Sequence, residues 1–207
     1  MSEIKAILYD LDGVLVDACD WHYKSLNQAL MEVCGFKISP REHESTFNGL
    51  PTQTKLGILK EQGRVAQDNF KAITTLKQQY TMELLENLTI DEGKVDLHRR
   101  VYALDIKMAC VTNAIRPSAE TMLRKTGQLA YMEIVVSNQD ITHPKPCGEG
   151  YIVAMVRLGI LPSEALIVED SPRGIEAAES TGARVLRVAN ATEVSWERIR
   201  PRLLELK

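Results

Sequence analysis

The sequence lacks the features that mark membrane, secreted and nucleic-acid-binding proteins. No apolar run approaches the roughly 18 residues that a membrane span needs, and residues 1–5 do not begin a signal peptide, in which a basic segment precedes a long apolar one. Only 5% of the 207 residues are aromatic and the net charge is −3, whereas nucleic-acid binders are typically basic. We therefore expect a cytoplasmic protein that binds neither membranes nor nucleic acids.

Glycine, proline and cysteine are also sparse. With 12 glycines and 8 prolines, the chain is neither collagen-like nor composed like a disordered segment. The four cysteines, Cys19, Cys34, Cys110 and Cys147, include no CxxC pair, so we expect reduced thiols that mostly fill the core. A length of 207 residues, of which 44% are hydrophobic, allows one large domain or two small ones.

Short apolar runs alternate with helical patterns through most of the chain. Runs typical of strands covered on both faces occur at 4–9, 108–111, 134–136, 165–168 and 185–188. Helical patterns follow three of these runs, at 117–125, 151–158 and 172–180. The alternation predicts an α/β fold in which right-handed crossovers build a doubly wound parallel sheet.

One connection is too long for a single crossover. About a hundred residues separate Asp10 from the strand near Lys107, whereas a crossover needs roughly a dozen. A helix at 91–103 would serve as the crossover, so the remaining residues must form a small domain of their own. Its helical patterns lie at 20–33, from Pro40 onwards, at 52–62 and at 66–87. We predict two domains, one made of 1–17 and 89–207, the other of 18–88.

The first predicted strand is followed directly by the acidic pair of Asp10-Leu11-Asp12-Gly13. In an open α/β sheet, ligands bind at the carboxyl ends of the strands, where both aspartates can point. Two carboxylates held close together repel each other, so they need a bound cation or a proton on one of them. An oxygen-rich site of this kind suits Mg²⁺. Two other interpretations are a simple Asp-Gly turn and a calcium loop, but the last position of such a loop would be Trp21 instead of glutamate.

Three further groups of polar residues follow other strands. Thr112 and Asn113 come after the second strand, Lys145 comes after the third between two prolines, and Glu169 with Asp170 comes after the fourth. Each group alone has an ordinary explanation, as a turn hydroxyl, an exposed loop lysine or an acidic helix N-terminus. Gathered at one sheet edge, they would combine a cation site with an anion cradle, as phosphoryl transfer requires.

In order along the chain, these segments resemble the four motifs of the haloacid dehalogenase-like hydrolases. The matching segments are Asp10-Leu11-Asp12-Gly13-Val14, Thr112-Asn113, Lys145-Pro146 and Glu169-Asp170-Ser171. The resemblance spans the whole chain, including the helical insertion after the first motif. It implies a Rossmann-like core with a four-helix cap domain, in the branch that holds phosphoglycolate phosphatases and β-phosphoglucomutases.

The resemblance also implies a role for each motif residue. Asp10 would attack phosphorus to form an aspartyl-phosphate, while Asp12 would protonate the leaving oxygen and then deprotonate the incoming water. Thr112, Asn113 and Lys145 would bind the phosphoryl group, and the lysine would also offset the charge of the nucleophile. A carboxylate attacks a phosphate dianion poorly until cations cancel this repulsion, so the assignment is chemically consistent.

The implied metal is Mg²⁺. Its ligands would be the Asp10 carboxylate, the backbone carbonyl of Asp12 and the Asp170 carboxylate. Glu169 would be a direct or a water-mediated ligand.

The cap domain would exclude water and select the substrate. We expect His22, Gly49 and Thr52 to face the substrate. Lys55 and Lys77 are further candidates, but for each lysine a solvated helix face is the expected position.

Individual residues separate the possible functions. Dehalogenases and phosphonate hydrolases of the family lack the second aspartate, so Asp12 argues against both. Mutases keep both aspartates, and His22 lies where they have a hinge histidine. However, Thr52 stands where the mutases have an arginine that grips a second phosphate. Phospho-acceptor receiver domains lack a large insertion after the first strand, so the insertion in this chain argues against a receiver domain.

We therefore predict a Mg²⁺-dependent phosphatase that hydrolyses the phosphate monoester of a small metabolite. The alternative is a β-phosphoglucomutase-like sugar-phosphate mutase. A non-catalytic protein that binds a phosphorylated ligand is a third interpretation, although such a protein would be expected to have lost one of the charged motif residues. The sequence predicts neither the substrate nor the oligomeric state.

Overall fold

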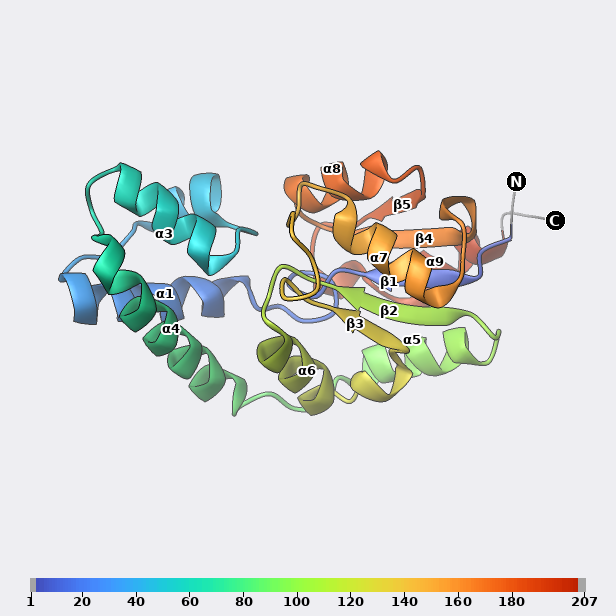
Figure 1. The fold of residues 1–207 in the computed structure, drawn as a ribbon. Coiled ribbons are helices and arrows are strands. Elements are labelled where there is room, and N and C mark those ends of the chain that lie inside the picture. The colour runs from blue at the N-terminus through green and yellow to red at the C-terminus, as the bar shows by residue number, and fades with distance from the viewer. Residues whose placement is uncertain (1–2, 205–207) are drawn as a thin grey trace. The chain divides into compact units, whose positions relative to one another are not determined.

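The computed structural model describes residues 3–204, except the side chains of Cys19 and Leu204, and divides the chain into two compact units (Figure 1). The sheet unit consists of 1–17 and 88–207, and the helical unit consists of 18–87. The second boundary lies one residue before the predicted one.

The sheet unit is built on a five-stranded parallel sheet with the strand order β3-β2-β1-β4-β5. The strands are β1 (Ala6–Tyr9), β2 (Lys107–Val111), β3 (Ile134–Val136), β4 (Ala165–Glu169) and β5 (Arg184–Arg187). Every residue of β1 and β4 is buried, as the continuous apolar runs predicted. Tyr9 pairs with Cys110 on one side and with Val168 on the other, so the three central strands end at the same level.

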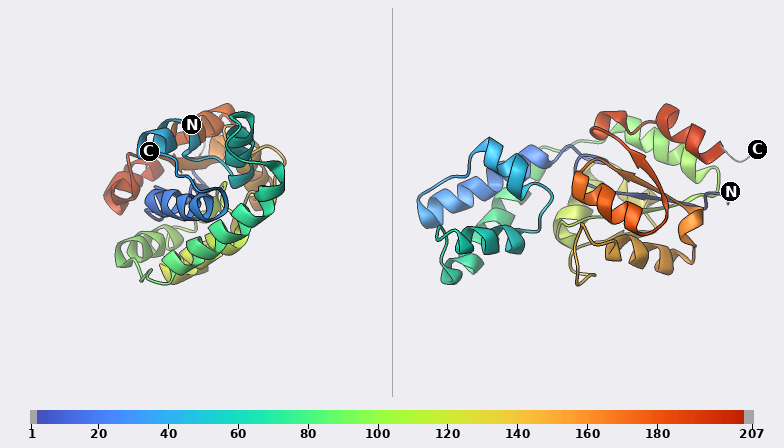
Figure 2. Two further views of the ribbon diagram at one scale, coloured as in Figure 1. Left: turned by 90° about the vertical axis from the view of Figure 1, so that its left-hand side faces the viewer. Right: turned by 90° about the horizontal axis from the view of Figure 1, so that it is seen from above.

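Helices cover both faces of this sheet, which confirms the predicted doubly wound α/β core (Figure 1). The helices are α5 (Glu92–Tyr102), α6 (Arg116–Lys125), α7 (Glu149–Leu158), α8 (Pro172–Ser180) and α9 (Trp196–Leu204). Helices α7 and α8 pack on the face that carries Leu8, Val111 and Ile167. Helix α5 lies on the opposite face beside α9, where Arg100 covers the ring of Trp196 (Figure 2). The four helices predicted for this unit differ from α5, α6, α7 and α8 by at most two residues at either end, whereas α9 was not predicted.

The helical unit contains α1 (Cys19–Cys34), α2 (Pro40–Glu42), α3 (Thr52–Glu61) and α4 (Phe70–Leu85). Ser39 and Glu42 cap α2 reciprocally, and a π-helical turn, His43–Phe47, continues the chain. A short 3₁₀ turn, Gln67–Asn69, precedes α4, so the predicted helix at 66–87 begins later than expected. Apolar side chains from α1, the π-helical turn, α3 and α4 form one core, which includes Leu26, Leu30, Phe47, Leu56 and Ile73.

The described cysteines correct part of the prediction. Cys34, Cys110 and Cys147 are unpaired, but only Cys110 is buried, whereas Cys147 is exposed in the loop after Lys145. The side chain of Cys19 lies outside the described part of the chain. Of the helices within 3–204, none is long and apolar enough to cross a membrane.

A buried polar network joins α5 to the loop after β1. His98 is completely buried, and its Nε2 lies 3.0 Å from Oε1 of Gln128. The Gln128 amide donates to the carbonyl of Leu15 at 3.0 Å and to the hydroxyl of Thr126 at 2.8 Å. The other ring nitrogen of His98 has no hydrogen-bond partner and the ring packs edge-on against Tyr9. Burial therefore lowers the pKa of His98 to about 4, so this histidine is neutral in the folded protein.

We expect His98 to make the fold less stable in mild acid. Below its unfolded pKa of roughly 6.5, the unfolded chain binds a proton that the folded chain does not, so the free energy of unfolding falls as the pH drops towards 4. Between pH 7.5 and pH 5 the contribution of this one group is about 2 kcal/mol. Denaturant unfolding of the wild type and of His98→Gln at both pH values measures this contribution. It is the difference between the two proteins in how much the free energy of unfolding falls from pH 7.5 to pH 5. Equal pH dependence of the two proteins would contradict a neutral His98.

Candidate active site

A tight loop holds the first acidic pair at the carboxyl end of β1, in the middle of the sheet. The backbone N–H of Asp10 still donates to Val168 in β4, and the chain then turns so that Gly13 N–H donates to the carbonyl of Val16. Gly13 has a φ of 89°, and a Cβ atom there would lie 2.2 Å from Oδ2 of Asp170. Only glycine allows this loop to approach the end of β4 so closely.

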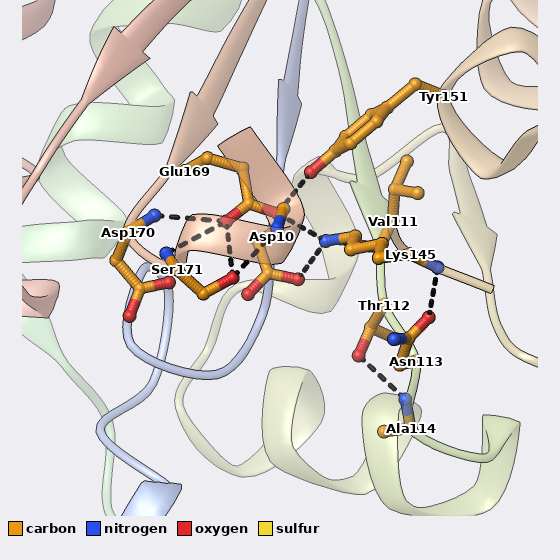
Figure 3. Close-up of polar contacts among 11 residues, drawn as sticks. Asp10, Val111, Thr112, Asn113, Ala114, Lys145, Tyr151, Glu169, Asp170 and Ser171 are labelled. Atoms are coloured by element: carbon orange, nitrogen blue, oxygen red, sulfur yellow. Dashed lines mark hydrogen bonds and ion pairs between the residues drawn. The ribbon is translucent and has the colours of Figure 1, made fainter. Parts of the chain in front are cut away.

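Lys145 connects the ends of three strands (Figure 3). Its ammonium nitrogen lies 2.5 Å from Oδ1 of Asp10, 2.6 Å from Oε1 of Glu169 and 3.0 Å from the carbonyl oxygen of Val111. All three charged side chains are buried. A lysine ammonium has three hydrogens, so each hydrogen has an acceptor within the protein. The lysine is thus tied to both carboxylates, and their charge holds the pKa of Lys145 well above its usual value despite its burial.

Glu169 is fully buried at the end of β4 and accepts five hydrogen bonds. Its Oε1 accepts from Lys145 and, at 2.6 Å, from the hydroxyl of Tyr151. Its Oε2 accepts from the backbone N–H groups of Asp170 and Ser171 and from the Ser171 hydroxyl, at 3.0, 3.3 and 3.4 Å. A carboxylate offers about four lone-pair sites, so the oxygens of Glu169 are saturated by the protein.

Three carboxylates are placed to hold a metal ion. Asp10, Glu169 and Asp170 each present an oxygen, and these oxygens lie within 4.8 Å of one another. Oδ1 of Asp170 is buried without a hydrogen-bond partner. Burial and the charge of Glu169 raise the pKa of Asp170 to about 6, and burial raises the pKa of Asp10 well above its usual value. A divalent cation would supply the missing partner and offset this cost, and carboxylate oxygens suit a hard cation, so the residues fit a divalent metal.

The structure brings the remaining motif residues to the same edge. Asp12 is half-buried and close enough for its charge to raise the pKa of both Asp10 and Asp170. Thr112 is buried, and its hydroxyl accepts from the backbone N–H of Ala114 at 3.0 Å. The side-chain oxygen of Asn113 accepts from the backbone N–H of Lys145 at 3.2 Å. Asn113 therefore ties the Lys145 loop to the end of β2.

The substrate-facing residues predicted in the insertion lie in the helical unit. His22 is half-buried in α1, and its Nδ1 lies 3.3 Å from the ammonium nitrogen of Lys77. Gly49 is exposed with a φ of 73°, and Thr52 is the first residue of α3. Their role towards a substrate stays a prediction. Lys55, in the first turn of α3, is buried, so the prediction that it lies on a solvated helix face is wrong.

Two residues of the site were missed by the sequence analysis. Tyr151 contributes both its hydroxyl to Glu169 and its ring, whose centroid lies 4.9 Å from the Lys145 ammonium. A Cβ atom on Gly174 would lie 1.9 Å from Oε1 of Glu169, so only glycine fits there in the first turn of α8. The available signal for Tyr151 was a tyrosine beside a run of apolar residues near the start of a predicted helix, six residues after Lys145. Gly174 follows Glu169 by only five residues, but the sequence analysis did not single it out, because the closeness of the two depends on the conformation of the turn between β4 and α8.

Comparisons with known proteins cover most of the sheet unit together with the insertion. The family model described as haloacid dehalogenase-like hydrolase matches residues 7–188. The pyrophosphatase PpaX of Bacillus velezensis is 32% identical over 189 residues, which cover 91% of this chain and 84% of that protein. A phosphorylated carbohydrates phosphatase of Thermotoga maritima is 28% identical over 182 residues, covering 86% and 82%. Among solved structures, β-phosphoglucomutase from Clostridium difficile superposes with a TM-score of 0.84 over 98% of both chains, at 20% identity.

Proposed function

Because the chain belongs to the haloacid dehalogenase-like hydrolases, we propose that it is a phosphatase that hydrolyses the phosphate monoester of a small metabolite. One observation carries the proposal: the buried Asp10 carboxylate is paired with Lys145 at 2.5 Å, beside carboxylates that fit a divalent cation. The relatives whose names specify phosphatases support it. A cytoplasmic location, as the sequence predicts, agrees with such substrates.

In the proposed reaction Asp10 is the nucleophile. Its Oδ2 is the oxygen not bonded to Lys145, and we assign to it the attack on phosphorus that breaks the bond to the leaving oxygen. Asp12 donates a proton to that leaving oxygen. Asp12 then takes a proton from water, which attacks the aspartyl-phosphate and releases inorganic phosphate. The charge of Lys145 favours the ionised form of Asp10 and reduces the repulsion between Asp10 and the phosphate dianion throughout.

The proposed cofactor is Mg²⁺, held by Asp10, the Asp12 carbonyl and Asp170. When bound, it would withdraw charge from the phosphoryl oxygens and so favour nucleophilic attack. The five hydrogen bonds to Glu169 favour a water-mediated over a direct role for that residue. Thr112 and Asn113 would orient the phosphoryl group, and a threonine hydroxyl that accepts one bond still has a proton to donate.

A sugar-phosphate mutase is the alternative within the family. A mutase must grip two phosphate groups, and Thr52 stands where the mutases have an arginine for the second one. The similarity to β-phosphoglucomutase at 20% identity concerns the fold alone. His22, Gly49 and Thr52 are proposed to choose the substrate's organic part. A non-catalytic binding protein is the weaker proposal, because it would not need the buried Asp10–Lys145 pair.

A phosphate-release screen tests the proposal. We expect the protein with Mg²⁺ to release phosphate from at least one small monoester, at a rate about a thousandfold or more above that of Asp10→Asn. The panel contains sugar phosphates, phosphoglycolate, nucleotides and pyrophosphate, and isomerisation of β-glucose 1-phosphate is assayed in parallel. Isomerisation that outpaces phosphate release would instead establish the mutase. A protein with neither activity would contradict both enzymatic proposals.

A further inference from the structure

We propose that Tyr151 is a positioning residue, which shares the carboxylate of Glu169 with Lys145 and thereby holds the lysine against Asp10. This inference rests on the proposed function, in which Asp10 is the nucleophile. Tyr151 is fully buried in the first turn of α7, so it touches no substrate and acts through its neighbours.

The hydroxyl of Tyr151 and the ammonium of Lys145 donate to the same oxygen. Both lie 2.6 Å from Oε1 of Glu169, and Figure 3 shows the hydroxyl pointing at the junction between Glu169 and Lys145. The lysine nitrogen is at the same time 2.5 Å from Oδ1 of Asp10. It therefore sits between two carboxylates, and any movement towards one lengthens its bond to the other.

Loss of the hydroxyl would disturb this balance in a definite direction. Oε1 of Glu169 would keep Lys145 as its only donor, and a buried carboxylate strongly favours its remaining charged partner. The ammonium would move towards Glu169 and away from Asp10. Asp10 would lose part of the charge that orients it, and small displacements of a nucleophile from its reactive position have large effects on rate.

Close backbone contacts around Glu169 and Tyr151 restrict movements of these two residues that could compensate for a shift of Lys145. Gly174 approaches Glu169 so closely that a Cβ atom would lie 1.9 Å from Oε1, which confines the carboxylate from one side. Gly150, next to Tyr151, lies against Val111, where a Cβ atom would come within 3.0 Å of Cγ1. The carbonyl of Val111 accepts the third lysine hydrogen. Helix α7 is thus held against β2, and the ring of Tyr151 stays over the ammonium at 4.9 Å.

Steady-state kinetics of Tyr151→Phe, with Mg²⁺ and the best monoester from the screen, test the proposal. We expect kcat to fall by about tenfold to a hundredfold, the rate equivalent of one hydrogen bond to a charged group. The KM for the substrate and the half-saturating Mg²⁺ concentration should stay within about twofold, because neither ligand contacts the hydroxyl. Tyr151→Leu, which also loses the ring, should lower kcat further. Tyr102→Phe is the matched control, since it removes a hydroxyl from a tyrosine that is 71% exposed in α5 of the same unit.

A double-mutant cycle identifies the residue through which Tyr151 acts. In the background of Glu169→Gln, where the shared carboxylate charge is absent, Tyr151→Phe should change kcat by less than about threefold. The same factor in both backgrounds would overturn the proposal, as would an unchanged kcat in the single variant. A raised KM with unaltered kcat, or a variant that does not fold, would show a structural role and overturn it too. A wild type without turnover would instead contradict the proposed function itself.

Discussion

Asp10→Asn is expected to lower kcat by at least about a thousandfold while the fold stays intact, because an amide is a poor nucleophile towards phosphorus. The substitution also removes the buried carboxylate that is 2.5 Å from Lys145. The lysine keeps two acceptors, Glu169 and the Val111 carbonyl, so no buried cation is left unpaired. Phosphate release and the thermal unfolding midpoint, measured on one preparation, separate the loss of chemistry from a loss of structure.

A matched control for Asp10→Asn is Asp105→Asn. Asp105 is an exposed aspartate of the same unit with a φ of 58°, a conformation that asparagine also adopts readily. This variant should retain the wild-type rate. Intact-mass analysis of quenched reactions adds a second measurement, since only the wild type and the control should carry a phosphoryl adduct. Turnover by Asp10→Asn above about a tenth of the wild-type rate would mean that another group is the nucleophile.

Removal of divalent metal is the second change with a large expected effect. We expect a chelator to lower phosphate release by about a hundredfold or more, and added Mg²⁺ to restore it. The physical reason is the cluster of Asp10, Glu169 and Asp170, whose oxygens lie within 4.8 Å of one another, with Oδ1 of Asp170 buried and unpartnered. Three carboxylates this close repel each other and the phosphate dianion unless a cation is bound.

A binding measurement tests where the metal binds, independently of its effect on the reaction rate. Mg²⁺ should raise the thermal unfolding midpoint of the wild type, because it binds only the folded chain. Asp170→Asn should abolish that increase, and Asp105→Asn should preserve it. Full activity in excess chelator would contradict a metal-dependent reaction, and an unchanged Mg²⁺ response in Asp170→Asn would move the metal away from this cluster.

The sequence determined the architecture because its signals are local. A strand buried on both faces must be apolar along its whole length, so β1 and β4 were recognisable as short continuous runs. The length between Asp10 and Lys107 required an insertion, since a crossover uses far fewer residues. Parallel strands bring their carboxyl ends to one edge, so polar residues after β1, β2 and β4 could be expected to meet.

Only the tertiary structure decided how these residues contact one another. The three acceptors of Lys145 and the hydroxyl of Tyr151 on Glu169 join segments far apart in the chain. The close approach of Gly174 to the same carboxylate depends on the conformation of the turn between β4 and α8. The burial of Lys55 and the exposure of Cys147 likewise differ from what the sequence pattern predicted. Sequence patterns report the preferences of single segments, whereas hydrogen-bond partners and burial depend on the distances between segments, which exist only after the chain has folded.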